Sequence, residues 1–115
     1  MTDTTQLGLW ITAFDQALSN QDFAGVAALF ADDCYWRDLL AFTWNIKTME
    51  GHSDIIEMLN ETVSTVMPRG WCASGDAEIA GNTVSSWITF ETAAGPCKGR
   101  LTLVDGKCYT LMTAL

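Results

Sequence analysis

Asp38 and His52 are the side chains of this 115-residue sequence whose chemistry best suits proton transfer. His52 is the only histidine, so a proton shuttle near neutral pH would depend on it. Asp38 closes the segment 34–38, whose bulky aromatic residues are typical of a β-strand. Because side chains alternate along a strand, Cys34, Trp36 and Asp38 share one face. We therefore expect Asp38 to lie at the mouth of an interior cavity as the candidate acid or base.

A simpler role is open to each of these two candidate catalytic residues. Asp38 could accept hydrogen bonds from backbone N–H groups at the strand end, or pair with a nearby Lys or Arg. His52 lies beside the expected start of a helix, which suits a solvated or capping role. A working His–Asp pair would require both side chains in one cavity.

Aromatic and guanidinium side chains suggest a binding pocket. Five tryptophans are many for so short a chain, and each buried indole N–H needs a partner. Trp36 and Trp44 could line a pocket or face another domain, or pack in the core. Arg37 and Arg100 could receive an anionic ligand, because a guanidinium suits a carboxylate, or could balance surface acids. The residues expected to line the pocket are Phe14, Trp36, Trp44, Trp87 and Arg100.

Metal and dinucleotide chemistry have little support in the sequence. The cysteines at 34, 72, 97 and 108 are widely spaced, and they contain no Cys-x-x-Cys pair. With one histidine to help, we expect no metal site and four free thiols. No Gly-x-Gly-x-x-Gly segment is present, so we expect no bound dinucleotide cofactor.

The charge of −8 excludes several kinds of partner. Residues 1–61 carry ten acidic side chains against only Arg37 and Lys47. Such a surface repels nucleic acid and anionic membranes. No apolar run approaches the roughly 20 residues of a membrane helix, and the first residues lack the basic region of a signal peptide. We therefore expect a cytoplasmic protein.

The spacing of apolar residues predicts helices first and strands later. Repeats of three and four residues predict helices over about 4–19, 23–30 and 53–67, the last ending at Pro68. Strands are predicted over 34–38, in a short segment near Thr48, and over about 71–79, 83–91, 98–104 and 107–115. Asp105-Gly106 predicts a two-residue hairpin. The prediction is one α+β domain over 1–115, with three N-terminal helices packed on a curved, mainly antiparallel sheet.

This layout resembles the cone-shaped NTF2-like domains, also called SnoaL-like or cystatin-like, which include the ketosteroid isomerases. Residues 30–38, Phe-Ala-Asp-Asp-Cys-Tyr-Trp-Arg-Asp, are similar to the isomerase segment that carries the general base, which implies that role for Asp38. The isomerases' oxyanion Tyr falls on Phe14, and their second oxyanion donor falls near Arg100. Because an enolate needs such donors, steroid-type isomerisation is not expected.

A closer resemblance is to the N-terminal NTF2-like domain of flavoprotein monooxygenase-like FAD/NAD(P) oxidoreductases. It lies in residues 35–48, Tyr-Trp-Arg-Asp-Leu-Leu-Ala-Phe-Thr-Trp-Asn-Ile-Lys-Thr, and 103–111, Leu-Val-Asp-Gly-Lys-Cys-Tyr-Thr-Leu. The resemblance implies either a stand-alone relative or an accessory domain of such an oxidoreductase.

Three functions remain open from the sequence. The first is a binding or accessory domain for a small apolar molecule, possessing no cofactor of its own. The second is a stand-alone, cofactor-independent isomerase, cyclase or dehydratase that uses Asp38. The third is a structural dimerisation module, and a homodimer is expected in any case. A cavity with convergent polar groups would favour the enzyme. An apolar cavity would favour the binding domain, and a filled core would favour the structural role.

Overall fold

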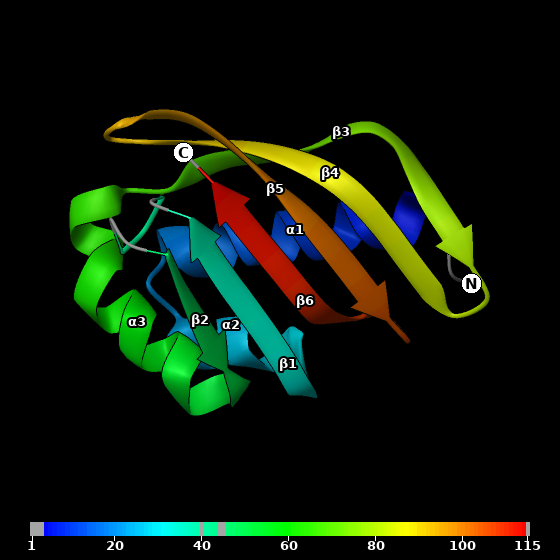
Figure 1. The fold of residues 1–115 in the computed structure, drawn as a ribbon, viewed down its shortest axis with the longest axis horizontal. Coiled ribbons are helices and arrows are strands. Elements are labelled where there is room, and N and C mark those ends of the chain that lie inside the picture. Colours follow the sequence, from blue (N-terminus) through cyan, green and yellow to red (C-terminus); the bar gives the residue numbers. More distant parts are fainter. Residues whose placement is uncertain (1–3, 40, 44–45, 115) are drawn as a thin grey trace.

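The computed structural model describes residues 4–39, 41–43 and 46–114. Its helices are α1 (Thr4–Ser19), α2 (Phe23–Ala28) and α3 (Gly51–Val66). Its strands are β1 (Phe30–Leu39), β2 (Ile46–Glu50), β3 (Arg69–Ala80), β4 (Thr83–Thr92), β5 (Gly95–Val104) and β6 (Lys107–Ala114) (Figure 1). Trp44, which was expected to line the pocket, lies outside the described residues. No helix in the described ranges has both the length and the apolar character needed to span a bilayer.

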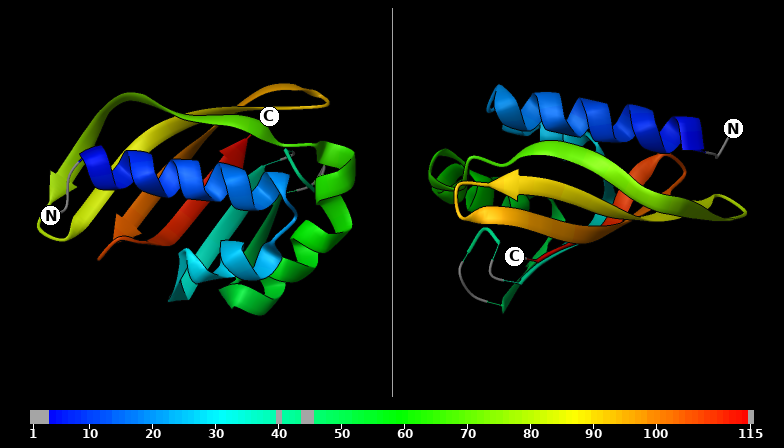
Figure 2. Two further views of the ribbon diagram at one scale, coloured as in Figure 1. Left: turned by 180° about the vertical axis from the view of Figure 1, so that it is seen from behind. Right: turned by 90° about the horizontal axis from the view of Figure 1, so that it is seen from above.

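One six-stranded sheet forms the body of the domain, in the order β2-β1-β6-β5-β4-β3. The β1–β6 pair is parallel, and the other strand pairs described are antiparallel. The helices cover one face of this twisted sheet, and Figure 1 looks onto the other, which we call the outward face. In Figure 2 α1 crosses the covered face, and α3 lies at the end formed by β1 and β2. The predicted α+β class is therefore confirmed.

The second helix is shorter than predicted. Asp22 caps α2 by accepting a hydrogen bond from the Gly25 N–H at 3.1 Å. The helix ends at Ala28, and Phe30 already belongs to β1, whereas the sequence placed Phe30 on the helix. The reason is tertiary, because the Leu29 carbonyl accepts hydrogen bonds from the Trp10 indole at 2.8 Å and from the Cys108 N–H at 2.9 Å.

The β5–β6 hairpin has the predicted two-residue turn. Asp105 and Gly106 have φ angles of 52° and 82°, which a type I′ turn requires at both central positions. Gly106 adopts this angle without a steric penalty, and Asp105 tolerates it better than most residues do. Val104 then pairs with Lys107 as the first rung of the hairpin.

A cluster of seven aromatic side chains fills the space between the helices and the sheet. Trp71 and Phe90 stack with ring centroids 4.0 Å apart, and Phe14 contacts Trp71 edge-on at 4.8 Å. All seven residues are buried. The cluster consists of Trp10, Phe14, Phe30, Trp36, Phe42, Trp71 and Phe90. Each ring removes a large apolar area from water, so this cluster is the main source of the core's stability.

Three of the four free cysteines, Cys34, Cys97 and Cys108, are buried, and Cys72 is exposed. Burial raises the pKa of the Cys108 thiol well above its ordinary value of 9.0, because a buried thiolate loses its hydration, and nearby Cys34 adds to the shift. Burial also raises the pKa of Cys34 and of Cys97.

The raised pKa of Cys108 predicts a loss of stability in alkali. Its contribution is fully present below the unfolded pKa of 9.0 and is lost as pH rises through the folded pKa. Cys108→Ala should lower the free energy of unfolding near neutral pH by about 1–2 kcal/mol, because it leaves a small cavity. The substitution should also reduce the loss of unfolding free energy at higher pH. Urea titrations of both proteins at about pH 7 and about pH 10 measure this, and equal declines would contradict it.

Candidate functional site

Asp38 lies at the centre of a buried hydrogen-bond cluster on the covered face of β1, with none of its surface exposed. Its carboxylate accepts from the Phe42 N–H at 3.0 and 3.1 Å and from the Thr43 N–H at 2.7 Å. The Thr43 hydroxyl donates to it at 2.9 Å, and the Thr113 hydroxyl donates at 2.7 Å. Thr113 in turn accepts from the Trp36 indole at 2.9 Å. The Asp38 side chain therefore secures the turn at 41–43 to β1 and β6.

This arrangement corrects the position expected for Asp38. Its inward direction is as predicted, but it lies beneath the turn rather than at the mouth of a cavity. A carboxylate has about four lone-pair sites, and four donor groups occupy them here. Of the two roles left open by the sequence, the geometry matches the structural acceptor.

His52 lies far from Asp38, on the first turn of α3. Its Nε2 is 3.1 Å from the Phe30 carbonyl oxygen and 3.0 Å from that of Ala31, so an Nε2–H donates to the start of β1. Phe30 pairs with Cys108 and Asp38 with Thr113 of β6, five residues apart, so Phe30 and Asp38 lie about 17 Å from each other along the sheet at 3.3 Å per residue. The structure therefore does not bring the two candidate catalytic residues together, and His52 ties α3 to β1.

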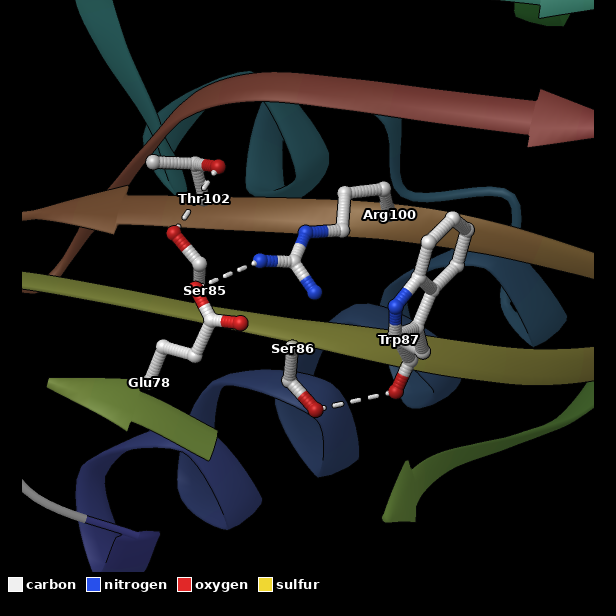
Figure 3. Close-up of polar contacts among 6 residues, drawn as sticks. All are labelled: Glu78, Ser85, Ser86, Trp87, Arg100 and Thr102. Atoms are coloured by element: carbon white, nitrogen blue, oxygen red, sulfur yellow. Dashed lines mark hydrogen bonds and ion pairs between the residues drawn. The ribbon is translucent and has the colours of Figure 1, made fainter. Parts of the chain in front are cut away.

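Trp87 and Arg100, which were expected to line the pocket, lie on the outward face, where each borders a separate shallow hollow. On β4 the buried residues Val84, Ser86 and Ile88 alternate with Trp87, whose side chain is 49% exposed. The Arg100 guanidinium lies 5.2 Å from the Trp87 ring centroid, and its Nη2 forms an ion pair with Glu78 at 3.1 Å (Figure 3).

Phe14 and Trp36 do point into the interior as predicted. Their ring centroids are 5.9 Å apart, and each also packs on Phe30. These contacts fill the space that a ligand would need. The described hollows of the molecule are instead lined by other residues.

A hollow of about 380 Å³ lies between the turn at 41–43, β2 and α3, and we call it the α3 pocket. Its lining combines apolar side chains and hydroxyls with one cation and one anion. The residues are Phe42, Thr43, Lys47, Met58, Glu61, Thr62, Thr65 and Val66. A second hollow of about 230 Å³ shares Lys47, Met58 and Glu61 with it, so the two are continuous along β2 and α3.

The α3 pocket adjoins both the Asp38 cluster and the aromatic core. Phe42 and Thr43, which line it, are the residues whose N–H groups bind Asp38. The Phe42 ring lies over Trp71 at 6.4 Å, and within the described residues the Trp71 indole N–H is the buried side-chain polar atom that lacks a partner. The described residues contain no cluster of three or more His, Cys, Asp or Glu that could hold a metal ion.

Neither a family model nor a curated protein matches the sequence. Solved structures do match. A cystatin-like domain of unknown function from Nostoc punctiforme PCC 73102 has a TM-score of 0.78 at 11% identity, over 97% of this chain and 76% of that one. An NTF2-like protein from Burkholderia xenovorans LB400 has a TM-score of 0.64 at 17% identity, over 98% and 91%. A putative ketosteroid isomerase from Kribbella flavida DSM 17836 has a TM-score of 0.62 at 17% identity, over 99% and 80%.

At these identities the likeness establishes the fold alone. The chain has the NTF2-like, cystatin-like fold, with helices on one face of a curved sheet, as predicted from residues 30–38 and from the order of the elements. Some of its structural neighbours are of unknown function and some are described as ketosteroid isomerase-like. Fold likeness does not transfer an activity, so function has to be argued from the pocket.

Proposed function

We propose that this domain binds a small, largely apolar molecule in the α3 pocket. The observation that carries the proposal is a hollow of about 380 Å³ with apolar walls at Phe42, Met58 and Val66. That volume lies within the range of small-molecule sites, which are apolar with a few polar groups that fix orientation. Thr62 and Thr65 supply such groups, and Lys47 and Glu61 are available to a polar end of the ligand.

The enzyme alternative has less support. An acid or base needs a lone pair or proton that faces the substrate, and the Asp38 oxygens are already bound by four donors. His52 donates to the backbone carbonyls of Phe30 and Ala31, at the opposite end of β1 from Asp38. A cofactor-independent isomerase, cyclase or dehydratase would therefore have to rearrange the turn at 41–43 first.

We also propose that this domain acts in the cytoplasm as an accessory domain of a flavin-dependent oxidoreductase. This proposal rests on the resemblance of segments 35–48 and 103–111 to the N-terminal domains of such enzymes. These segments adjoin in the fold, because Tyr35 pairs with Thr110 and Trp36 with Leu111 in the β1–β6 ladder. They would thus present one continuous surface to a catalytic domain.

The structural alternative proposes that the domain serves to form the homodimer expected from the sequence. The exposed Trp87 and Tyr109 on the sheet favour contact between copies. Arg37 and Arg100 at the centre of the outward face disfavour it, because a two-fold axis there would bring like charges together. Sedimentation velocity at micromolar concentration distinguishes a monomer from a dimer.

The binding proposal predicts that filling the α3 pocket abolishes binding of an apolar probe. Thr65→Trp places an indole into the hollow from an exposed helix position, and Asn60→Trp adds the same indole to an exposed position of α3 outside the described hollows. Titration with the neutral fluorophore Prodan should show at least about a tenfold weaker Kd for Thr65→Trp alone. Equal Kd values for wild type and both variants would overturn the proposal.

A further inference from the structure

The outward face of the sheet carries several of the cations of an otherwise acidic chain, whereas Lys47 lines the α3 pocket on the covered face. The net charge is −8, yet all six Lys and Arg residues lie in strands, and the described helices carry only acidic charges. Two of these cations, Arg37 and Arg100, lie near the centre of the outward face, in β1 and β5. The acidic helices would repel an anion, whereas these two arginines attract one to the outward face.

The register of the strands places these two arginines in one row across the sheet. Arg37 and Arg100 both pair with Met112 of β6, and Arg100 also pairs with Trp87 of β4. Adjacent strands lie about 4.8 Å apart, so the two Cα atoms are separated by about 10 Å across Met112. In the structure the Arg37 guanidinium is turned toward Thr48 of β2 and that of Arg100 toward Glu78 of β3, so the two groups flank Met112. Side chains of this length can turn toward a ligand above Met112.

Much of the hydrogen-bonding capacity of both guanidiniums is unused by the protein. Arg37 donates from Nη1 to the Thr48 hydroxyl at 3.2 Å and forms no ion pair among the described residues. Arg100 uses Nη2 for Glu78, and its Cζ lies 5.2 Å from the Trp87 ring centroid (Figure 3). Each guanidinium has five N–H donors in a planar fork that matches a carboxylate, so both retain donors for a shared anion.

A hollow of about 330 Å³ lies between these arginines, and we call it the outward-face hollow. Met112 contributes apolar surface to it, and Tyr35 forms part of its lining. Thioether and aromatic groups favour contact with a flat aromatic body. The hydroxyls of Thr48 and Thr110 also line it. The hollow therefore suits an aromatic ring with one acidic group.

Acidic residues lie on both sides of the hollow, with Asp33 and Glu50 near Tyr35 and with Glu78 paired to Arg100. Asp33, followed by Tyr109 and Glu50, raises the pKa of Tyr35, so that its phenol stays neutral and able to donate a hydrogen bond. The negative charge of Asp33 and Glu50 would repel an anion from the Tyr35 side. The acid group of a ligand is thus directed toward Arg37 and Arg100, with the ring toward Tyr35.

We propose that the outward-face hollow binds a small aromatic carboxylate, with the carboxylate held between Arg37 and Arg100 and the ring packed on Met112 and Tyr35. This site is separate from the α3 pocket, because the two share no lining residue and lie on opposite faces of the sheet. It is therefore independent of the function proposed above.

The test uses 2-naphthoate as the probe and calorimetric titration of the whole chain. Saturable binding is expected in the wild type, with Kd weakened at least about tenfold by Arg37→Gln and little binding of the neutral 2-naphthamide. Arg37→Gln removes only one bond to Thr48, so the fold should persist, and circular dichroism checks this. Lys98→Gln is the matched control, because Lys98 is an exposed cation on the same face, one row away from Arg100.

Four outcomes would overturn the proposal. The first is the absence of saturable naphthoate binding by the wild type. The second is equal weakening by Lys98→Gln, which would indicate non-specific attraction. The third is loss of binding in Thr65→Trp, which would assign the probe to the α3 pocket. The fourth is a change in sedimentation coefficient on Arg37→Gln without probe, which would assign the guanidinium to contact between copies.

Discussion

Asp38→Asn is expected to lower the free energy of unfolding by about 3 kcal/mol or more and the melting temperature by about 10 °C. The carboxylate accepts from two backbone N–H groups and two hydroxyls in a site without exposed surface. An amide has only one acceptor oxygen, and its NH₂ group would face donors. The turn at 41–43 would then lose part of its anchor, leaving buried N–H groups unpaired.

Asp32→Asn is the matched control, because Asp32 lies in the same strand and is exposed. It should change the melting temperature by no more than about 2 °C, since exposed substitutions are usually close to neutral. Differential scanning calorimetry measures both variants. An Asp38→Asn protein as stable as Asp32→Asn, but with altered Prodan binding, would instead assign Asp38 a direct role in the pocket.

The parts of the fold that were predicted correctly are those specified by local sequence. The stripe in α1, the Asp22 cap and the Asp105-Gly106 turn depend on residues within a few positions of one another. Where a long-range contact intervened, the prediction was wrong. Phe30 continues the helical spacing, but pairing with Cys108 of β6 draws it into a strand.

The candidate site was predicted only in part, because strand alternation defines two faces without saying which face is covered. For Asp38 the direction was predicted, but one donor comes from Thr113, which is 75 residues away. Trp87 was expected to line the pocket, but it lies on the outward face. The neighbouring set Val84, Ile88 and Phe90 is more apolar as a group, and this was the signal that could have placed Trp87 outside.

The α3 pocket could not be found from periodicity. One wall is lined by Phe42, Thr43 and Lys47, which come from a segment without a regular apolar period. The opposite wall consists of Met58, Thr62, Thr65 and Val66, which lie three and four residues apart on α3. That spacing was visible in the sequence, but only the fold shows that β2 and the turn at 41–43 face it.

Gly99→Ala is expected to be among the most destabilising single substitutions in this chain. Gly99 is buried in β5, and a Cβ there would overlap the carbonyl oxygen of Met112 in β6 and lie 3.4 Å from the Ile88 side chain. Because Met112 contributes a backbone atom, the β5–β6 pair itself must separate to make room. Overpacking of this kind costs about 1–3 kcal/mol or more, and a disturbed ladder adds to it.

Gly8→Ala provides the opposite case in the same chain. Gly8 is exposed in α1 with no atom within 4 Å of an added Cβ, so alanine should raise the free energy of unfolding by about 0.5–1 kcal/mol. Urea denaturation of both variants measures the contrast. Arg100 follows Gly99 directly and pairs with Met112, so Gly99→Ala should also weaken naphthoate binding in any protein that still folds. A Gly99→Ala protein with wild-type stability would mean that β5 and β6 are not held as close together as this register requires.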